Sequence, residues 1–145
     1  MRRILFVDDD PGVIKQFKRV LHSMSHEWEM EFVNSGKEAL SLMSKTAFDV
    51  IASDIQMPEM DGRKLLDNVR KCYPATVRII LSESQDKETL LKSAESVHQF
   101  LMKSSDTETI KYTIERSCKL KDMLKDETLI KIITEIKDLP SVPSL

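Results

Sequence analysis

The chain has 145 residues, of which 41% are hydrophobic and 32% are charged, and its formal net charge at pH 7 is −2. This composition is typical of a soluble globular protein, and the near balance of charge argues against a surface that binds nucleic acid or a membrane along its whole extent. The two cysteines lack the spacing of a zinc site or a disulfide framework. No apolar run is long enough to span a membrane and the start lacks a signal-peptide pattern, so we expect a cytoplasmic protein.

Five short segments are each expected to form a strand, and they alternate with stretches of helical spacing. The segments cover residues 3–7, 28–33, 49–54, 77–82 and 98–103. The first, third and fourth are apolar runs typical of a strand buried on both faces, whereas residues 28–33 alternate like a strand or form a loop in part. Asp10 and Pro11 are typical of a helix start, with an N-cap and a proline at the first helical position. Further helices are expected at 35–43, after the loop 57–62, at 87–94 and from Asp106 onward. This alternation predicts an α/β fold, a doubly wound parallel sheet of five strands with helices on both faces.

Functional groups stand at the carboxyl ends of four of these strands. Asp8 and Asp9 follow the first, Asp54 ends the third, and Ser82 and Lys103 end the fourth and fifth. Ligands of such sheets bind outside these ends. Two carboxylates ~4 Å apart repel by about 4 kcal/mol at an effective dielectric near 20, so a group of three is poorly explained without a cation. Oxygen ligands favour Mg²⁺ or Mn²⁺, and the set indicates Mg²⁺-dependent phosphoryl transfer to an aspartate nucleophile.

Four pieces of sequence carry a family resemblance. They are "ILFVDDDPGV", "DVIASDIQMPEMDG", "VRIILS" and "FLMKS". Each is common alone, but the ordered set is specific, and over residues 3–121 it resembles the receiver (CheY-like) domain of bacterial two-component response regulators. The resemblance implies a flavodoxin-like sheet of strand order 2-1-3-4-5 and a receiver domain at residues 1–121. It also implies a signalling domain, not an enzyme, that catalyses only its own aspartyl phosphorylation and dephosphorylation.

The resemblance further implies which residues accept the phosphoryl group and bind the metal. Asp54 would accept the group from a sensor histidine kinase or a phosphotransfer protein. Asp9 would bind Mg²⁺ directly and Asp8 mainly through water, with Mn²⁺ as the other possible ion. Asp54 and the backbone carbonyl of Gln56 would complete the protein ligands.

The remaining roles concern the conformational switch. Lys103 would pair with the acceptor carboxylate and later with the phosphoryl oxygens. Ser82 would hydrogen-bond the phosphoryl group and move toward it. Phe100 would be the aromatic switch, turning inward as Ser82 leaves its space, while Pro58 and Gly62 would shape the loop after the acceptor strand.

Three features depart from the family pattern. Glu83 stands where the family has a small residue, and a bulky acid there is expected to slow or repel an entering phosphodonor. Ser104 follows Lys103, where the family has a proline in a cis peptide. A cis bond before a non-proline residue costs about 2.5–4 kcal/mol, so none is assumed here. Gln56 and Ser84 occupy positions that tune dephosphorylation, and neither predicts a lifetime.

Residues 122–145 extend beyond a receiver domain, and their apolar residues keep helical spacing. The apolar positions of the last helix and the tail are Ile110, Ile114, Met123, Leu124, Leu129, Ile130, Ile133 and Ile136. We expect a homodimer through a coiled coil or, equally, a helix folded back on its own domain. The ending "IKDLPSVPSL" resembles the entry to an HDOD output domain, which predicts a linker into a truncated output domain. An HD-GYP phosphodiesterase and a DNA-binding domain are alternative outputs, and this segment itself is expected to bind neither nucleic acid nor a membrane.

Two other functions stay open. A receiver that is not phosphorylated, a pseudo-receiver, would act as a protein-interaction module, and Glu83 favours it. Haloacid-dehalogenase-like phosphatases place an aspartate nucleophile in a DxDx[TV] motif after the first strand, which Asp8 and Asp10 match. Gly12, however, stands where Thr or Val is required, and no later acidic pair completes that site. The identity of the modified aspartate distinguishes these functions.

Overall fold

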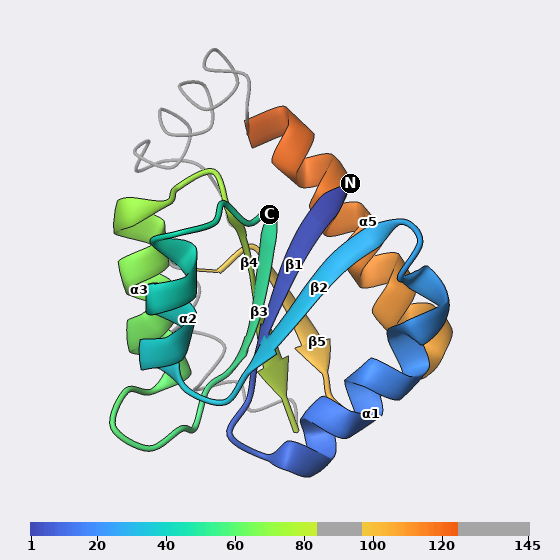
Figure 1. Cartoon of the computed structure of the whole chain (residues 1–145), viewed down its shortest axis with the longest axis horizontal. Helices are drawn as coiled ribbons and strands as arrows, with labels where there is room; N and C mark the ends of the chain where they lie inside the picture. Colours follow the sequence, from blue (N-terminus) through green and yellow to red (C-terminus); the bar gives the residue numbers. More distant parts are fainter. Residues whose placement is uncertain (84–96, 125–145) are drawn as a thin grey trace, which may run out of the picture.

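The five predicted strands form one parallel sheet in the order β2-β1-β3-β4-β5, which confirms the predicted fold class and topology (Figure 1). This computed structural model describes residues 1–83 and 97–124. The strands are β1 (Arg2–Val7), β2 (Trp28–Val33), β3 (Val50–Asp54), β4 (Val77–Ser82) and β5 (Gln99–Met102). Because all five run in the same direction, the polar residues at their carboxyl ends lie along one edge of the sheet.

Helices cover both faces of the sheet. They are α1 (Pro11–Leu21), the 3-10 turn η1 (His22–Met24), α2 (Gly36–Met43), α3 (Gly62–Cys72) and α5 (Thr107–Leu124). The helices α1 and α5 pack on one face, and α2 and α3 pack on the other (Figure 1). On β1, Ile4 and Phe6 belong to the first core and Leu5 and Val7 to the second. A strand buried on both faces requires an unbroken apolar run, which is the pattern of residues 4–7.

Side-chain caps fix the starts of three helices next to this edge. Asp10, Ser35 and Asp61 each accept a hydrogen bond from a backbone N–H two or three residues later, at 2.8, 3.1 and 2.7 Å respectively. Such caps satisfy N–H groups that have no partner inside the helix. The predicted N-cap at Asp10, with Pro11 as the first helical residue, is confirmed.

Parts of the sequence-based description lie outside the described residues. These are the helix expected at 87–94 and the apolar tail after residue 124, so the linker and the output domain remain predictions. The predicted boundary at residue 121 falls within α5 and also remains a prediction. Within the described ranges, no helix combines the length and the apolar character that a membrane crossing requires.

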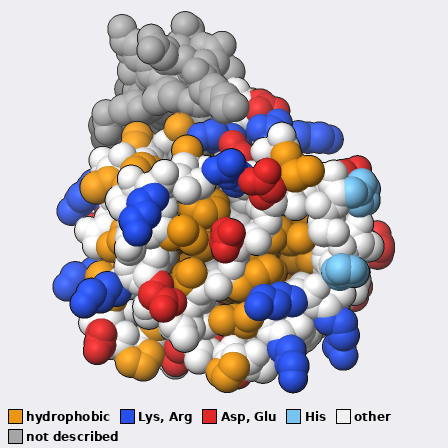
Figure 2. All heavy atoms as spheres, viewed as in Figure 1, with side chains coloured by type: hydrophobic (Ala, Val, Ile, Leu, Met, Phe, Trp, Pro, Cys, Tyr) orange, Lys and Arg blue, Asp and Glu red, His pale blue; other side chains and the backbone are white. Residues whose placement is uncertain are grey.

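The molecular surface carries charges of both signs. On the face shown in Figure 2, basic side chains are interspersed with acidic and apolar ones. This mixture matches the formal net charge of −2. In its described part, this face therefore presents no continuous basic stripe of the kind that binds nucleic acid.

Candidate functional site

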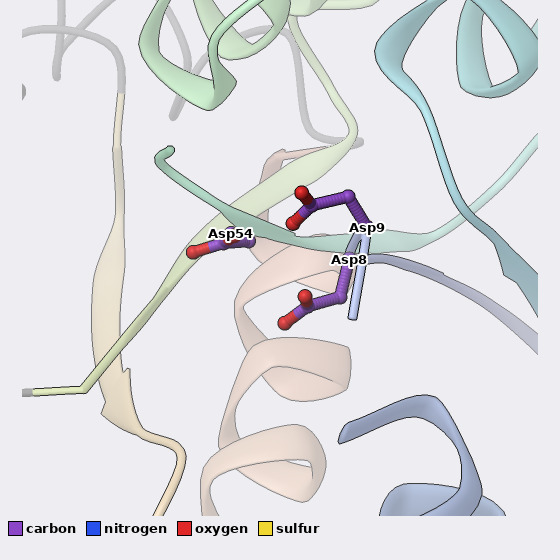
Figure 3. A group of neighbouring side chains, drawn as sticks. All are labelled: Asp8, Asp9 and Asp54. Atoms are coloured by element: carbon purple, nitrogen blue, oxygen red, sulfur yellow. The ribbon is translucent and has the colours of Figure 1, made fainter. Parts of the chain in front are cut away.

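Three aspartates meet at the carboxyl edge of the sheet. Asp8 and Asp9 follow β1 and Asp54 ends the neighbouring strand β3, and the side chains of the first two extend toward Asp54 (Figure 3). One carboxylate oxygen of each lies within 4.8 Å of the other two. Asp8 and Asp54 are buried whereas Asp9 is exposed, so the cluster is open to solvent on one side. The predicted convergence of these aspartates is therefore observed.

Lys103, directly after β5, supplies positive charge to this cluster. Its Nζ lies 2.9 Å from Asp8 Oδ2 and 3.0 Å from Asp54 Oδ1. The exposed fractions are 8% for Lys103, 1% for Asp8 and 8% for Asp54. Buried charges are expensive unless they are well compensated. Here one ammonium faces two buried carboxylates, which leaves an excess of negative charge.

The surroundings shift the pKa values of two of these groups. Burial raises the pKa of the Asp54 carboxyl, and the charge of Asp8 adds to the rise, although the contact with Lys103 opposes it. Burial acts to lower the pKa of Lys103, but the contacts with Asp8 and Asp54 outweigh it, and the net shift is upward. The ammonium is therefore charged at neutral pH, whereas ionised Asp54 is less stable than an aspartate in water.

The hydrogen bonds of the aspartates leave one buried oxygen suited to a cation. Asp8 Oδ1 accepts from the N–H of Asp10, and Asp54 Oδ1 accepts from the N–H of Ile55, both at 2.9 Å. Asp8 Oδ2 forms an ion pair with Lys103 but has no aligned hydrogen-bond donor. Within residues 1–83 and 97–124, it is the one buried side-chain oxygen or nitrogen that lacks a hydrogen-bond partner. Such an oxygen, in a cluster of carboxylates without His or Cys, fits a hard divalent cation such as Mg²⁺.

The loop after β3 is held against the end of that strand by Gly62. This residue begins α3 and donates its backbone N–H to the carbonyl of Ile55 at 2.6 Å. A Cβ at Gly62 would lie 1.7 Å from the carbonyl oxygen of Asp54, so only glycine fits. In the same loop Glu59 adopts a φ of 66°, in the left-handed region. The predicted part of Gly62 in shaping this loop is confirmed.

A cavity of about 470 Å³ lies over the cluster and collects most of the predicted residues. Its lining comprises Asp8, Asp9, Asp10, Asp54, Ile55, Gln56, Leu81, Ser82, Glu83 and Lys103. Ser82 is half-buried at the end of β4, and its carbonyl accepts the N–H of Lys103 at 2.8 Å. Phe100 lies on β5 apart from this lining, with 42% of its surface exposed.

Two contacts in this cavity were not predicted. Lys103 pairs with Asp8 as well as with Asp54, and Glu83 Oε1 lies 3.8 Å from the same ammonium. Strand order indicates which residues are neighbours, but the choice of partner depends on side-chain rotamers that the sequence does not specify. The bond before Ser104 is trans, like the other peptide bonds of the described residues, as expected for a non-proline residue.

A five-stranded parallel sheet of this order with helices on both faces is the CheY-like, flavodoxin-like fold. The sequence model of the response regulator receiver domain matches residues 4–115, and the chain belongs to this family. Receiver domains are signalling domains that switch on phosphorylation and bind Mg²⁺ at an acidic pocket. They interact with histidine kinases or phosphotransfer proteins and with output domains.

Individual relatives agree with this assignment. The chain is 30% identical over 113 residues to the transcriptional regulatory protein GlrR of Escherichia coli (strain K12), a match that covers 77% of this chain and 25% of that protein. The structure of the chemotaxis protein CheY4 of Vibrio cholerae is similar with a TM-score of 0.74 and 29% identity, covering 81% of this chain and 98% of that one. The signal receiver domain of an HD domain-containing protein from Pseudomonas fluorescens Pf-5 shares the fold, with a TM-score of 0.81, 22% identity, and coverage of 87% and 93%. Since the chain spans about a quarter of the length of GlrR, the match says nothing of the rest of that protein.

Proposed function

We propose that Asp54 is the phosphoacceptor of this receiver domain and takes its phosphoryl group from a sensor histidine kinase or a phosphotransfer protein. The observation that supports this best is the position of Lys103, 2.9 Å from Asp8 and 3.0 Å from Asp54 in a cavity open to solvent. Placed there, the lysine keeps the acceptor carboxylate in place and is ready to pair with the oxygens of an incoming phosphoryl group.

The transfer is a substitution at phosphorus. A carboxylate oxygen of Asp54 forms a bond to the phosphorus of a phosphohistidine as the P–N bond breaks. The electron pair of that bond stays on the imidazole nitrogen, which takes a proton from water. Because burial raises the pKa of Asp54, its ionised form is poorly stabilised in the free protein and reacts more readily than a solvated carboxylate. The domain would catalyse its own dephosphorylation at the same site.

Asp8, Asp9, Asp54 and the backbone carbonyl of Gln56 would hold the Mg²⁺ ion. This ligand set is supported by the cluster of three carboxylates and by Asp8 Oδ2, which has no aligned hydrogen-bond donor. Mn²⁺ has the same preference for oxygen ligands. When bound, the ion supplies positive charge that offsets the charge of the phosphoryl oxygens.

Ser82 and Phe100 are proposed as the switch residues. In the register of β4 and β5, Ile80 pairs with Phe100 and Ser82 with Met102. Because side chains alternate along a strand, Ser82 and Phe100 project from the same face of the sheet, two residues apart. A phosphoryl group adds about 1.5 to 2 negative charges at the cavity, and Ser82 is near enough to respond. A coupling of about 1–3 kcal/mol suffices to shift the two conformations.

The output is proposed from the sequence of the tail. We retain a receiver domain at residues 1–121 followed by a helical linker into an HDOD-like output domain at 122–145, with a homodimer through the C-terminal helix and a cytoplasmic location. The exposed apolar side chains Tyr112 and Met123 on α5 are compatible with such contacts.

The decisive experiment is phosphorylation of the purified chain by acetyl phosphate in the presence of Mg²⁺, read by intact mass, with beryllofluoride as a parallel phosphoryl analogue. We expect a gain of one phosphoryl group that is lost without Mg²⁺ and in Asp54→Asn. No gain and no response to beryllofluoride would contradict the proposal and favour a pseudo-receiver. A gain that survives Asp54→Asn but disappears in Asp8→Asn would instead indicate the phosphatase-like site.

A further inference from the structure

One acid in the cavity has no part in the function proposed above. Of the five carboxylates among the described lining residues, three form the cation cluster and Asp10 caps α1. The fifth belongs to Glu83, which directly follows β4. It is not among the carboxylates that meet within 4.8 Å, so it is not placed as a metal ligand.

Glu83 nevertheless contacts the site through Lys103. Its Oε1 lies 3.8 Å from Lys103 Nζ, compared with 2.9 Å for Asp8 and 3.0 Å for Asp54. The Glu83 side chain is 80% exposed, whereas that of Lys103 is 9% exposed. The contact of the Glu83 carboxylate with Lys103 is thus the longest of the three, and this carboxylate lies on the solvent side of the ammonium. Exposed ion pairs are weak, so the contact between Glu83 and Lys103 breaks easily. The negative charge of Glu83 nevertheless stays at the mouth of the cavity.

We propose, on the basis that Asp54 is the phosphoacceptor, that Glu83 is a charge gate that slows phosphorylation of Asp54 by small anionic acyl phosphates. In that reaction an Asp54 oxygen bonds to phosphorus as the acyl O–P bond breaks, and the carboxylate leaves with the electron pair. The donor must bring its negative oxygens to Lys103. Glu83 repels the approaching donor and competes with it for that ammonium.

The charge balance of the cavity makes one further charge effective. Its described lining holds five carboxylates and one ammonium, so even a bound divalent cation leaves the site negative. A dianionic donor is therefore repelled as it enters, and charges at a cavity mouth act on encounter rates. A donor protein differs, because its own side chains can face Glu83 while its phosphoryl group enters. The gate thus selects against free small-molecule donors.

The test compares the rates at which the full chain and its variants are phosphorylated by acetyl phosphate at saturating Mg²⁺, followed by intact mass at several salt concentrations. Glu83→Gln keeps the size of the side chain and removes its charge, Glu83→Asp keeps the charge, and Glu115→Gln removes an exposed acid outside the cavity. One unit charge ~10 Å from a dianion in water predicts an acceleration of about fourfold in Glu83→Gln at low salt. Screening should reduce the difference severalfold near 1 M salt.

The outcomes separate the gate from the function on which it rests. A faster Glu83→Gln, with Glu83→Asp and Glu115→Gln close to the wild type and the difference shrinking with salt, supports the gate. An equal or slower rate in Glu83→Gln, or an acceleration that salt leaves unchanged, overturns the gate while Asp54 is still phosphorylated. If no variant gains a phosphoryl group, the proposed function fails and the gate fails with it.

Discussion

Replacing Asp54 by Asn should stabilise the folded protein in the absence of divalent cations. One carboxylate oxygen of Asp54 lies within 4.8 Å of an oxygen of the buried Asp8, a repulsion of about 3.5 kcal/mol at an effective dielectric near 20, whereas water screens the exposed Asp9. The attraction to Lys103 at 3.0 Å offsets about 5.5 kcal/mol on the same scale. Burial of the ionised Asp54 costs several kcal/mol more, so burial and the repulsion together exceed the attraction by about 1 to 2 kcal/mol.

The asparagine keeps the favourable contacts of the site. Its amide oxygen can still accept the N–H of Ile55, which lies 2.9 Å from Asp54 Oδ1. Lys103 retains Asp8 at 2.9 Å, so the buried ammonium is not left unpaired. The substitution therefore removes the net penalty of burying the charge beside Asp8 and little else, and we expect the free energy of unfolding to rise by about 1 to 2 kcal/mol at pH 7.

The assay is urea unfolding in EDTA, followed through Trp28. This residue is the chain's single tryptophan and is 4% exposed on β2, so its fluorescence reports the loss of the core. Asp67→Asn is a matched control with the opposite sign, because Asp67 pairs with Arg70 and Lys71 on the surface of α3 and its loss should cost up to about 0.5 kcal/mol. An Asp54→Asn protein that is no more stable than the wild type would refute the reasoning.

The pH dependence tests the cause of this stabilisation. The pKa of Asp54 is raised above its ordinary value of 3.8 in the folded state, so the folded protein holds this proton more tightly than the unfolded chain. Below pH 3.8 both states are protonated and the penalty is absent. Above the raised folded pKa both states are ionised and the penalty is complete. The advantage of Asp54→Asn should therefore appear as the pH rises from 3.8 and stay constant near neutrality.

Further substitutions test the other parts of the site. Lys103→Met should lower the free energy of unfolding by about 3 kcal/mol at pH 7 in a urea titration, because Asp8 and Asp54 would remain buried without their cation. Since the pKa of Lys103 is raised above 10.5, its contribution should be complete below that pH and be lost as the pH rises through the folded value, so Lys103→Met should lack this alkaline loss. Gly62→Ala should lower the melting temperature strongly, as measured by circular dichroism, because its Cβ would meet the Asp54 carbonyl at 1.7 Å. Gly12→Ala, where the nearest atom is a side-chain oxygen at 3.1 Å, is the milder control.

The sequence predicted the central strands β1, β3 and β4 well because they are buried on both faces. The runs 28–33 and 77–82 match β2 and β4 at both ends, and the other three strands differ by one residue at one or both ends. The run 98–103 shortens to Gln99–Met102, although the backbone N–H groups of His98 and Lys103 still donate to the carbonyls of Arg78 and Ser82. His98 Nδ1 accepts the backbone N–H of Arg78 at 3.0 Å, and Lys103 faces the carboxylates.

The sequence predicted which residues of the site lie near one another, but not which of them are in contact. Parallel strands bring Asp8, Asp54 and Lys103 to one edge whatever their rotamers. The carboxylate with which the Lys103 ammonium pairs depends on side-chain torsions and on burial, and tertiary packing sets both. Arg78 shows the same limit, because it lies within an apolar run and is only 5% exposed. Its guanidinium donates to the carbonyl of Thr76 at 3.1 Å, a backbone partner that no motif indicates.

The excess of negative charge that destabilises the free protein should also make its stability respond to Mg²⁺. A ligand at 100 times its dissociation constant adds about 2.7 kcal/mol to the free energy of unfolding, which exceeds the 1 to 2 kcal/mol expected for Asp54→Asn. Asn offers one oxygen without a full charge, so at a Mg²⁺ concentration that saturates the wild type the variant should stay largely unbound and gain little. The order of stability should therefore invert, with Asp54→Asn more stable in EDTA and the wild type more stable at saturating Mg²⁺. An order that stays the same in both conditions would show that Asp54 contributes to the charge of the cluster but not to the binding of the ion.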